Sequence, residues 1–160
     1  MQSGKIFVAD VDGANVIKMV GDVRLTLCIS FDQFIDQMYA KTNFHSVIFD
    51  LRETEAIDST TLGLMAKISI LFQERFHQLP LVISPNSGIN RLLESMGFED
   101  IFEIISNIDL PVGSQVQLRE DCKNEAVAKQ KVIEAHKILM GLNEVNRQEF
   151  NDLVKSLEQK

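Results

Sequence analysis

Residues 49–63 read FDLRETEAIDSTTLG, a stretch that joins an apolar strand to an amphipathic helix. The strand, HSVIFDL over 45–51, has a β-branched apolar centre and is predicted to be buried. A polar connection is expected over 52–57. Asp58 is a favourable N-cap, after which Leu62, Met65 and further apolar residues recur at helical spacing. The stretch therefore predicts a strand, a loop and a helix.

The residues before this stretch predict two strands and a helix. Residues 5–10 and 14–20 are β-rich and are separated by Asp12-Gly13, a pair that favours a tight hairpin. Gly21-Asp22 is expected to end the second strand. The sequence Ser30-Phe31-Asp32-Gln33 resembles a capping box, so a helix is expected over about 31–41.

The residues after it continue the alternation of strand and helix. Strands are expected over 79–84 and 101–105, and between them Ile89, Leu93 and Met96 share one helical face that ends at Gly97. Apolar strands that alternate with amphipathic helices are typical of a parallel sheet. The fold class is therefore α/β, with a mostly parallel central sheet, an antiparallel N-terminal hairpin and helices packed on it.

Composition divides the chain into two parts. The net charge is −7, all of it within residues 1–111, whereas residues 112–160 carry equal numbers of basic and acidic side chains. The break falls near Pro111, so we expect a domain over 1–111 and a helical extension over 112–160. The acidic balance argues against nucleic acid and anionic membranes as partners. With neither a membrane-spanning run nor a signal-peptide pattern in the sequence, a cytoplasmic location is expected.

The extension has an apolar stripe at helical spacing. Its members are Ala128, Val132, Ala135, Leu139, Leu142, Phe150, Leu153 and Leu157. Residues 141–143, Gly-Leu-Asn, either break the stripe into two helices or weaken a single one. The stripe is too short to identify a coiled coil, so two alternatives stand: a hairpin folded onto its own domain, or helices that bind a partner or a second copy.

No enzyme motif occurs. The sequence has no phosphate-binding glycine loop and no nucleophile elbow, and its histidines lack metal-ligand spacing. Acidic residues near strand ends suggest a magnesium pocket, but the later strands lack the lysine that a receiver-type site needs. Cys28 and Cys122 are expected to be reduced thiols. We therefore expect a non-enzymatic protein without a cofactor or metal.

Three hydroxyl side chains, Ser59, Thr60 and Thr61, stand on the first turn of the helix that Asp58 caps. A helix N-terminus has unpaired N–H groups and the positive end of the helix dipole, so a phosphate on this turn would be accommodated. The simpler alternative is that Asp58 and the hydroxyls only cap the helix.

The string from Phe49 to Gly63 resembles the strand-loop-helix motif of STAS domains (sulphate transporter and anti-sigma factor antagonist), in which a strand ending in Asp-Leu leads to D-S-[ST]-G-L-G. Other pieces agree in order: Gly21-Asp22, LVISP at 81–85, and LLESMGF at 92–98. The resemblance covers residues 5–105. It implies the STAS fold.

The resemblance also implies a function. In stand-alone members the serine after the Asp, here Ser59, is phosphorylated by an anti-sigma-type serine kinase and dephosphorylated by a PP2C-like phosphatase. The unmodified domain binds an anti-sigma factor or related regulator, and phosphorylation releases it. Thr60 remains a rival acceptor. The implied partner-binding residues are Asp22, Arg24, Asp58, Ser59, Thr60, Thr61 and Leu62.

Two departures bear on the partner. Thr61 stands where the family has glycine, and Arg24 where it often has an acid. The extension, with Ala135-His136-Lys137, resembles that of a proteobacterial subgroup of anti-sigma factor antagonists. That subgroup acts with a phosphatase or kinase fused to a response regulator, and in some cases a diguanylate cyclase, in control of motility and biofilm growth. The alternative is a STAS scaffold subunit without phosphorylation.

Overall fold

The expected N-terminal hairpin forms in the computed structural model, which describes residues 2–110, 113–120 and 124–159. Asp12 and Gly13 have φ values of 53° and 89°, as a tight hairpin turn requires. Strands β1 (Lys5–Val11) and β2 (Ala14–Val23) run antiparallel from this turn. The Asp-Gly pair therefore determines the local register.

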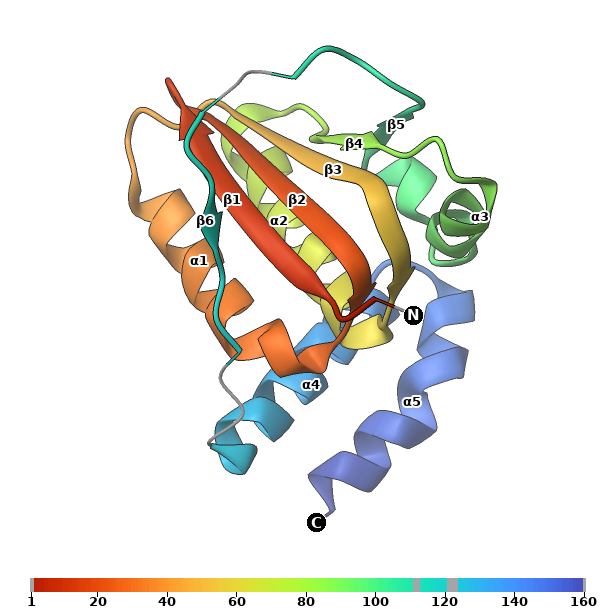
Figure 1. Cartoon of the computed structure of the whole chain (residues 1–160). Coiled ribbons are helices and arrows are strands. Elements are labelled where there is room, and N and C mark those ends of the chain that lie inside the picture. The colour runs from red at the N-terminus through yellow and green to blue at the C-terminus, as the bar shows by residue number, and fades with distance from the viewer. Residues whose placement is uncertain (1, 111–112, 121–123, 160) are drawn as a thin grey trace.

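Over the described residues six strands form one sheet, in the order β5-β4-β3-β2-β1-β6. Strands β3 (Ser46–Ile57), β4 (Leu81–Ile83) and β5 (Glu103–Ile105) continue the sheet from β2 in parallel. The two-residue β6 (Val116–Gln117) lies antiparallel to β1 at the other edge (Figure 1). The predicted α/β fold, mostly parallel with an antiparallel hairpin, is confirmed.

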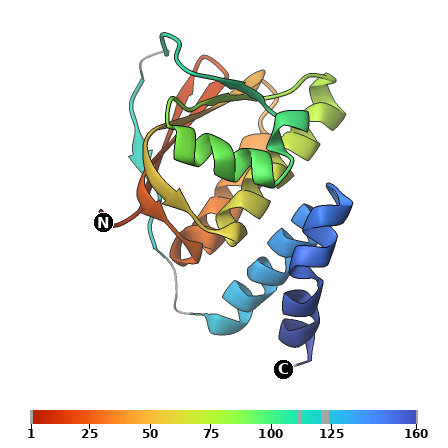
Figure 2. The same ribbon diagram turned by 90° about the vertical axis from the view of Figure 1, so that its right-hand side faces the viewer.

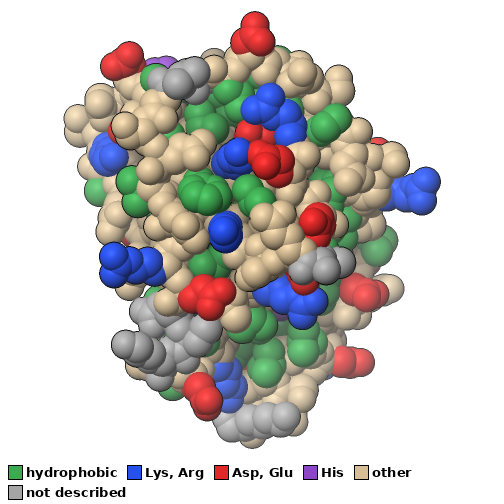
Figure 3. All heavy atoms as spheres, viewed as in Figure 1, with side chains coloured by type: hydrophobic (Ala, Val, Ile, Leu, Met, Phe, Trp, Pro, Cys, Tyr) green, Lys and Arg blue, Asp and Glu red, His purple; other side chains and the backbone are tan. Residues whose placement is uncertain are grey.

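Helices cover one face of the sheet. Figure 1 shows α1 (Cys28–Ala40) and α2 (Ser59–Phe76) behind β1–β3, and α3 (Ser87–Ser95) beside β4 and β5. The apolar sides of these elements meet in a core that includes Ile17, Met19, Ile35, Phe49, Leu51 and Met65. No described helix covers the opposite face of β1–β3, where Figure 3 shows basic and acidic side chains interspersed.

Strands β2 and β3 are longer than the sequence indicated. The expectation that Gly21-Asp22 ends β2 was wrong, because the strand bends through two register shifts and continues to Val23. Gly21 adopts φ of 73°, a conformation that glycine accommodates at a bulge. The expected connection over 52–57 was also wrong, because these residues pair with β2 up to Val23↔Ile57. Because most of these side chains are polar, the sequence pattern did not indicate a strand here, and backbone pairing with β2 holds it.

Helix α1 begins earlier than expected. A 3₁₀ turn at Leu25–Leu27 leads directly into Cys28, and no side chain caps the helix. The capping-box interpretation of Ser30 was wrong, since its hydroxyl donates to the carbonyl of Leu27 at 3.1 Å. Asp32, within the same four residues, turns inward to two lysines.

The C-terminal extension folds back as a helical hairpin. Helix α4 (Glu125–Met140) packs along α2, and α5 (Glu144–Glu158) returns beside α4 (Figure 2). Asn143 caps α5, so residues 141–143 break the stripe into two helices. Ala135, Leu139 and Phe150 belong to the same buried cluster as the domain core. Of the two alternatives, the structure therefore has the hairpin folded onto its own domain.

Two expectations concern residues outside those described. The boundary between 111 and 112 falls in such a segment, and so does Cys122. Cys28 is buried near the start of α1.

Candidate functional site

The C-terminal ends of the neighbouring strands β2 and β3 lie side by side at one end of the sheet. The two strands run parallel, through two register shifts, to the last pair Val23↔Ile57, and the N–H of Asp58 donates to the carbonyl of Val23 at 3.0 Å. Residues that follow the two strands are thereby brought together, although more than thirty positions separate them in the chain. The predicted partner-binding residues therefore lie at this end of the sheet, with Asp22 and Arg24 on the β2 side and Asp58 and the residues after it on the β3 side.

Asp58 ties the two segments with its side chain. Oδ1 accepts from the backbone N–H of Thr61 at 2.9 Å, which makes Asp58 the N-cap of α2 as predicted. Oδ2 accepts from the backbone N–H of Leu25 at 2.7 Å. One carboxylate thus caps the helix and holds the loop after β2 against it.

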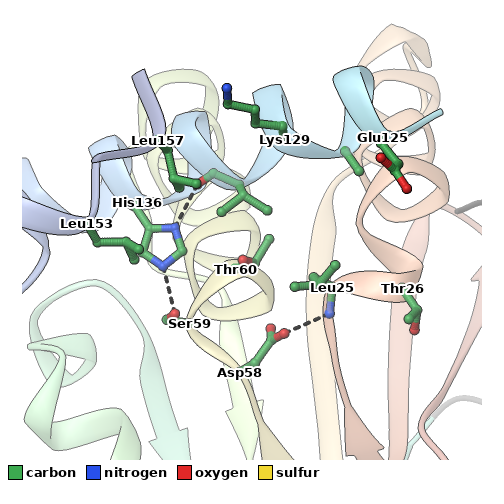
Figure 4. A pocket seen from close by; sticks show the side chains of 12 residues that line it. Leu25, Thr26, Asp58, Ser59, Thr60, Glu125, Lys129, His136, Leu153 and Leu157 are labelled. Carbon is green, nitrogen blue, oxygen red and sulfur yellow. Dashed lines mark hydrogen bonds between the residues drawn. The ribbon is translucent and has the colours of Figure 1, made fainter. Parts of the chain in front are cut away.

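Ser59, on the first turn of α2, meets a histidine from the extension. Its Oγ lies 2.7 Å from Nε2 of His136, whose Nδ1 lies 2.7 Å from the carbonyl oxygen of Val132 (Figure 4). A carbonyl oxygen can only accept, so Nδ1 carries a proton. In the neutral ring Nε2 then accepts the hydrogen bond from the Ser59 hydroxyl.

The imidazole of His136 is held firmly in this position. It is only 2% exposed, and its ring meets that of Phe150 edge-on with 5.0 Å between centroids. In Figure 4 the ring points from α4 down toward Ser59. The serine hydroxyl is therefore in contact with a rigid, buried partner.

Beside this pair lies a pocket of about 750 Å³. Asp58, Ser59 and Thr60 form its polar wall (Figure 4). The remaining lining comes from the loop after β2 and from both helices of the extension: Leu25, Thr26, Glu125, Ala128, Lys129, Val132, His136, Leu153 and Leu157. Figure 3 shows hydrophobic side chains gathered at the lower end of the molecule, where α4 and α5 lie. The pocket is mostly apolar, and the extension supplies more than half of the residues that line it.

The predicted site residues differ in exposure. Ser59 is half-buried, whereas Thr60 and Thr61 are each 2% exposed and Leu62 is 1% exposed. Arg24 is exposed and its Nε lies 2.7 Å from Oδ2 of the half-buried Asp22, outside the pocket lining. Thr61, at the family's glycine position, faces the interior. Among the three neighbouring hydroxyls, that of Ser59 is the most accessible.

Sequence reasoning missed the contribution of the extension. The apolar stripe containing Ala135 and Leu139 indicated a face that would be covered, but not the surface that covers it. His136 lies one residue beyond Ala135 and so points to the side of that face. The contact of His136 with Ser59 depends on the packing of α4 along α2, which the sequence pattern does not indicate.

The described residues contain no group of three or more His, Cys, Asp or Glu side chains that could hold a metal ion. In the same part of the chain, no helix is long and apolar enough to cross a membrane.

Comparison with protein families is in line with this geometry. The family model described as STAS domain matches residues 7–110, about two thirds of the chain. The match includes β2, β3 and α2 and ends before β6 and the hairpin. No curated protein matches the chain.

Proposed function

The chain belongs to the STAS domain family, and on that premise we propose that it is an anti-sigma factor antagonist controlled by phosphorylation of Ser59. In this proposal the unmodified form binds an anti-sigma factor or a related regulator in the cytoplasm. Phosphorylation of Ser59 releases that partner.

The observation that carries the proposal is the position of Ser59. It directly follows the N-cap Asp58, opens α2, and lies on the wall of a mostly apolar pocket. A phosphate here lies at the positive end of the helix dipole, so α2 itself tolerates the modification. Thr60 is less suited as the acceptor because it is buried.

The switch follows from charge and desolvation. Phosphate adds a charge of about −1.5 to −2 at neutral pH. It would stand beside the Asp58 carboxylate, in a domain that already carries the whole net charge of −7. An apolar partner surface that had covered the pocket would then have to desolvate a dianion, at a cost that weakens binding.

The remaining partners of the proposal rest on the family resemblance. They are a serine kinase, a PP2C-like phosphatase that is fused to a response regulator, and a diguanylate cyclase. Control of motility and biofilm growth would be the output. A dimer through the C-terminal helices would have to use faces other than the one buried against α2.

One observation favours a second candidate, a STAS scaffold subunit without phosphorylation. The Ser59 hydroxyl already has a structural partner, Nε2 of His136 at 2.7 Å. A serine that only links the hairpin to α2 would need no kinase.

The experiment combines site mapping with partner capture. Mass spectrometry of the protein from its native cells in two growth conditions should find phosphate on Ser59, with an occupancy that changes between conditions. The tagged wild type and Ser59→Ala should retain one co-purifying protein that Ser59→Asp loses.

Ser87→Asp is the matched control, because Ser87 is also the first residue of a helix and follows the capping Asn86. It should retain the partner. Unmodified Ser59 in both conditions, together with normal capture by Ser59→Asp, would favour the scaffold instead.

A further inference from the structure

We propose that the α4–α5 hairpin is the moving part of the switch: closed, it completes the pocket beside Ser59, and phosphate on Ser59 opens it. This inference rests on the proposed function only in taking Ser59 as the modified residue. It assigns to the extension, which lies outside the matched family region, the role of converting a local modification into loss of a binding surface.

The first step is the geometry at Ser59. Oγ lies 2.7 Å from Nε2 of His136, a separation that a hydrogen atom fills and a phosphoryl group cannot. In the transfer, Oγ bonds to the γ-phosphorus of ATP, the bond from that phosphorus to the β–γ bridging oxygen breaks to release ADP, and the hydroxyl proton passes to a base of the kinase. The Ser59 hydroxyl, which donates to His136 in the unmodified protein, is thereby replaced by oxygens of a phosphate dianion, which only accept.

The second step is that His136 cannot turn away within the closed hairpin. Its Nδ1 is engaged by the carbonyl of Val132 in its own helix, and its ring is buried against Phe150. A neutral Nε2 would face phosphate oxygens acceptor to acceptor. Separating these two acceptors therefore requires movement of α4, which carries the imidazole, and of α5, which packs against it.

The third step is that the closed hairpin has a defined position on the domain. Helix α4 crosses α2 where Gly63 faces Ala135, and a β-carbon at Gly63 would collide with the backbone carbonyl of Ala135. Nearby, the buried Asp32 of α1 accepts from Lys67 of α2 at 2.7 Å and from Lys131 of α4 at 2.6 Å. Such an interface has a defined closed position that a single group can exclude.

The fourth step links closure to binding. The hairpin's side of the pocket includes Val132, Leu153 and Leu157, whereas Leu25 and Ser59 line the domain's side. When the hairpin moves away from α2, the pocket loses this wall. Closure and phosphate on Ser59 are then mutually exclusive, and by linkage a partner that needs the closed pocket opposes phosphorylation.

The test measures hairpin opening without the kinase or the partner. Phosphoserine is incorporated biosynthetically at position 59 of the full chain, and in a separate preparation at position 87. Amide hydrogen exchange is followed in α4 and α5. Phosphoserine at 59 should speed exchange there by about tenfold or more, because the closed hairpin would leave a buried, charged acceptor without a donor, which costs more than a neutral hydrogen bond contributes. Phosphoserine at 87 should leave it unchanged.

A second experiment tests the same opening with substitutions that add a β-carbon at the interface. Gly63→Ala should also speed exchange in α4 and α5, whereas Gly141→Ala should not, because a β-carbon at Gly141 meets its nearest neighbour, the carbonyl of Ile138, at an ordinary 3.4 Å. Protected amides in β1–β3 would show that each variant is folded. If Gly63→Ala does not fold, the phosphoserine comparison still decides.

Unchanged or slower exchange in α4 and α5 with phosphoserine at 59 would overturn the inference. Slower exchange would mean that His136 binds the phosphate and holds the hairpin closed. Failure of the proposed function would look different, since it would appear as unmodified Ser59 in native cells while the incorporated phosphate still opened the hairpin.

Discussion

Asp58 shows how much one side chain decides at this site. Its two carboxylate oxygens serve different segments, Oδ1 the first turn of α2 and Oδ2 the loop after β2. Ser59 is held between that cap and His136, so its hydroxyl has a fixed direction. The residue that carries the proposed modification is positioned by neighbours from both parts of the chain.

Replacement of Asp58 should have graded effects. Asp58→Ala removes both acceptors and should lower the free energy of unfolding by about 2 kcal/mol, above the usual value of about 1 kcal/mol for an N-cap. Asp58→Asn retains one oxygen for Thr61 but presents an amide NH₂ to Leu25, so its loss should be intermediate. Urea unfolding measures both. Equal stability of the two variants would contradict the double role.

At the scale of elements, the hairpin is part of the core rather than an appendage on the surface. Leu139 of α4 is fully buried, and Asn146 of α5 donates to the carbonyls of Leu139 and Met96 at 3.0 and 2.9 Å. The hairpin is therefore tied to the end of α3 as well as to α2. Its apolar face stabilises the domain while its His136 contacts the site.

Two leucines of the hairpin allow a matched test. Leu139→Ala should cost about 2–5 kcal/mol because it empties a buried site, whereas Leu153→Ala, at a position 41% exposed, should cost no more than about 0.5 kcal/mol. Thermal or urea unfolding with a single cooperative transition measures the difference. If both changes were equally mild, the hairpin would not be packed as described.

For the molecule as a whole, one buried carboxylate joins three helices. Asp32 of α1 is 4% exposed at its side chain and pairs with Lys67 of α2 and Lys131 of α4. Burial raises the pKa of Asp32, but hydrogen bonds from Lys131 and Lys67 outweigh it and the net pKa is lowered. The same bond to Asp32 raises the pKa of Lys131. The ion cluster fastens the hairpin to the domain.

This cluster predicts how stability depends on pH. Because the pKa of Asp32 is lower in the folded state, its contribution is present above the ordinary value of 3.8 and is lost as pH falls through the folded value. Asp32→Asn should cost about 2 kcal/mol or more at pH 7, and its deficit should shrink below about pH 4. The exposed Asp152→Asn, on α5, is the control and should show neither effect, because Asp152 shifts the pKa of neither Asp32 nor Lys131. A deficit independent of pH would contradict the role of the charge.

The alternation of apolar strands and amphipathic helices is sufficient to predict this fold, because burial imposes its period on each element separately. Residues 49–63 likewise indicated the capped helix and its serine, since an N-cap depends on neighbours within one turn. The lengths of β2 and β3 could not be obtained this way: residues 52–57 are held by pairing with β2, which local pattern does not record. The same limit hid the contact between Ser59 and His136. Seventy-seven positions separate them, and only the packing of α4 on α2 at Gly63, a consequence of how two distant surfaces fit, brings them to hydrogen-bond distance.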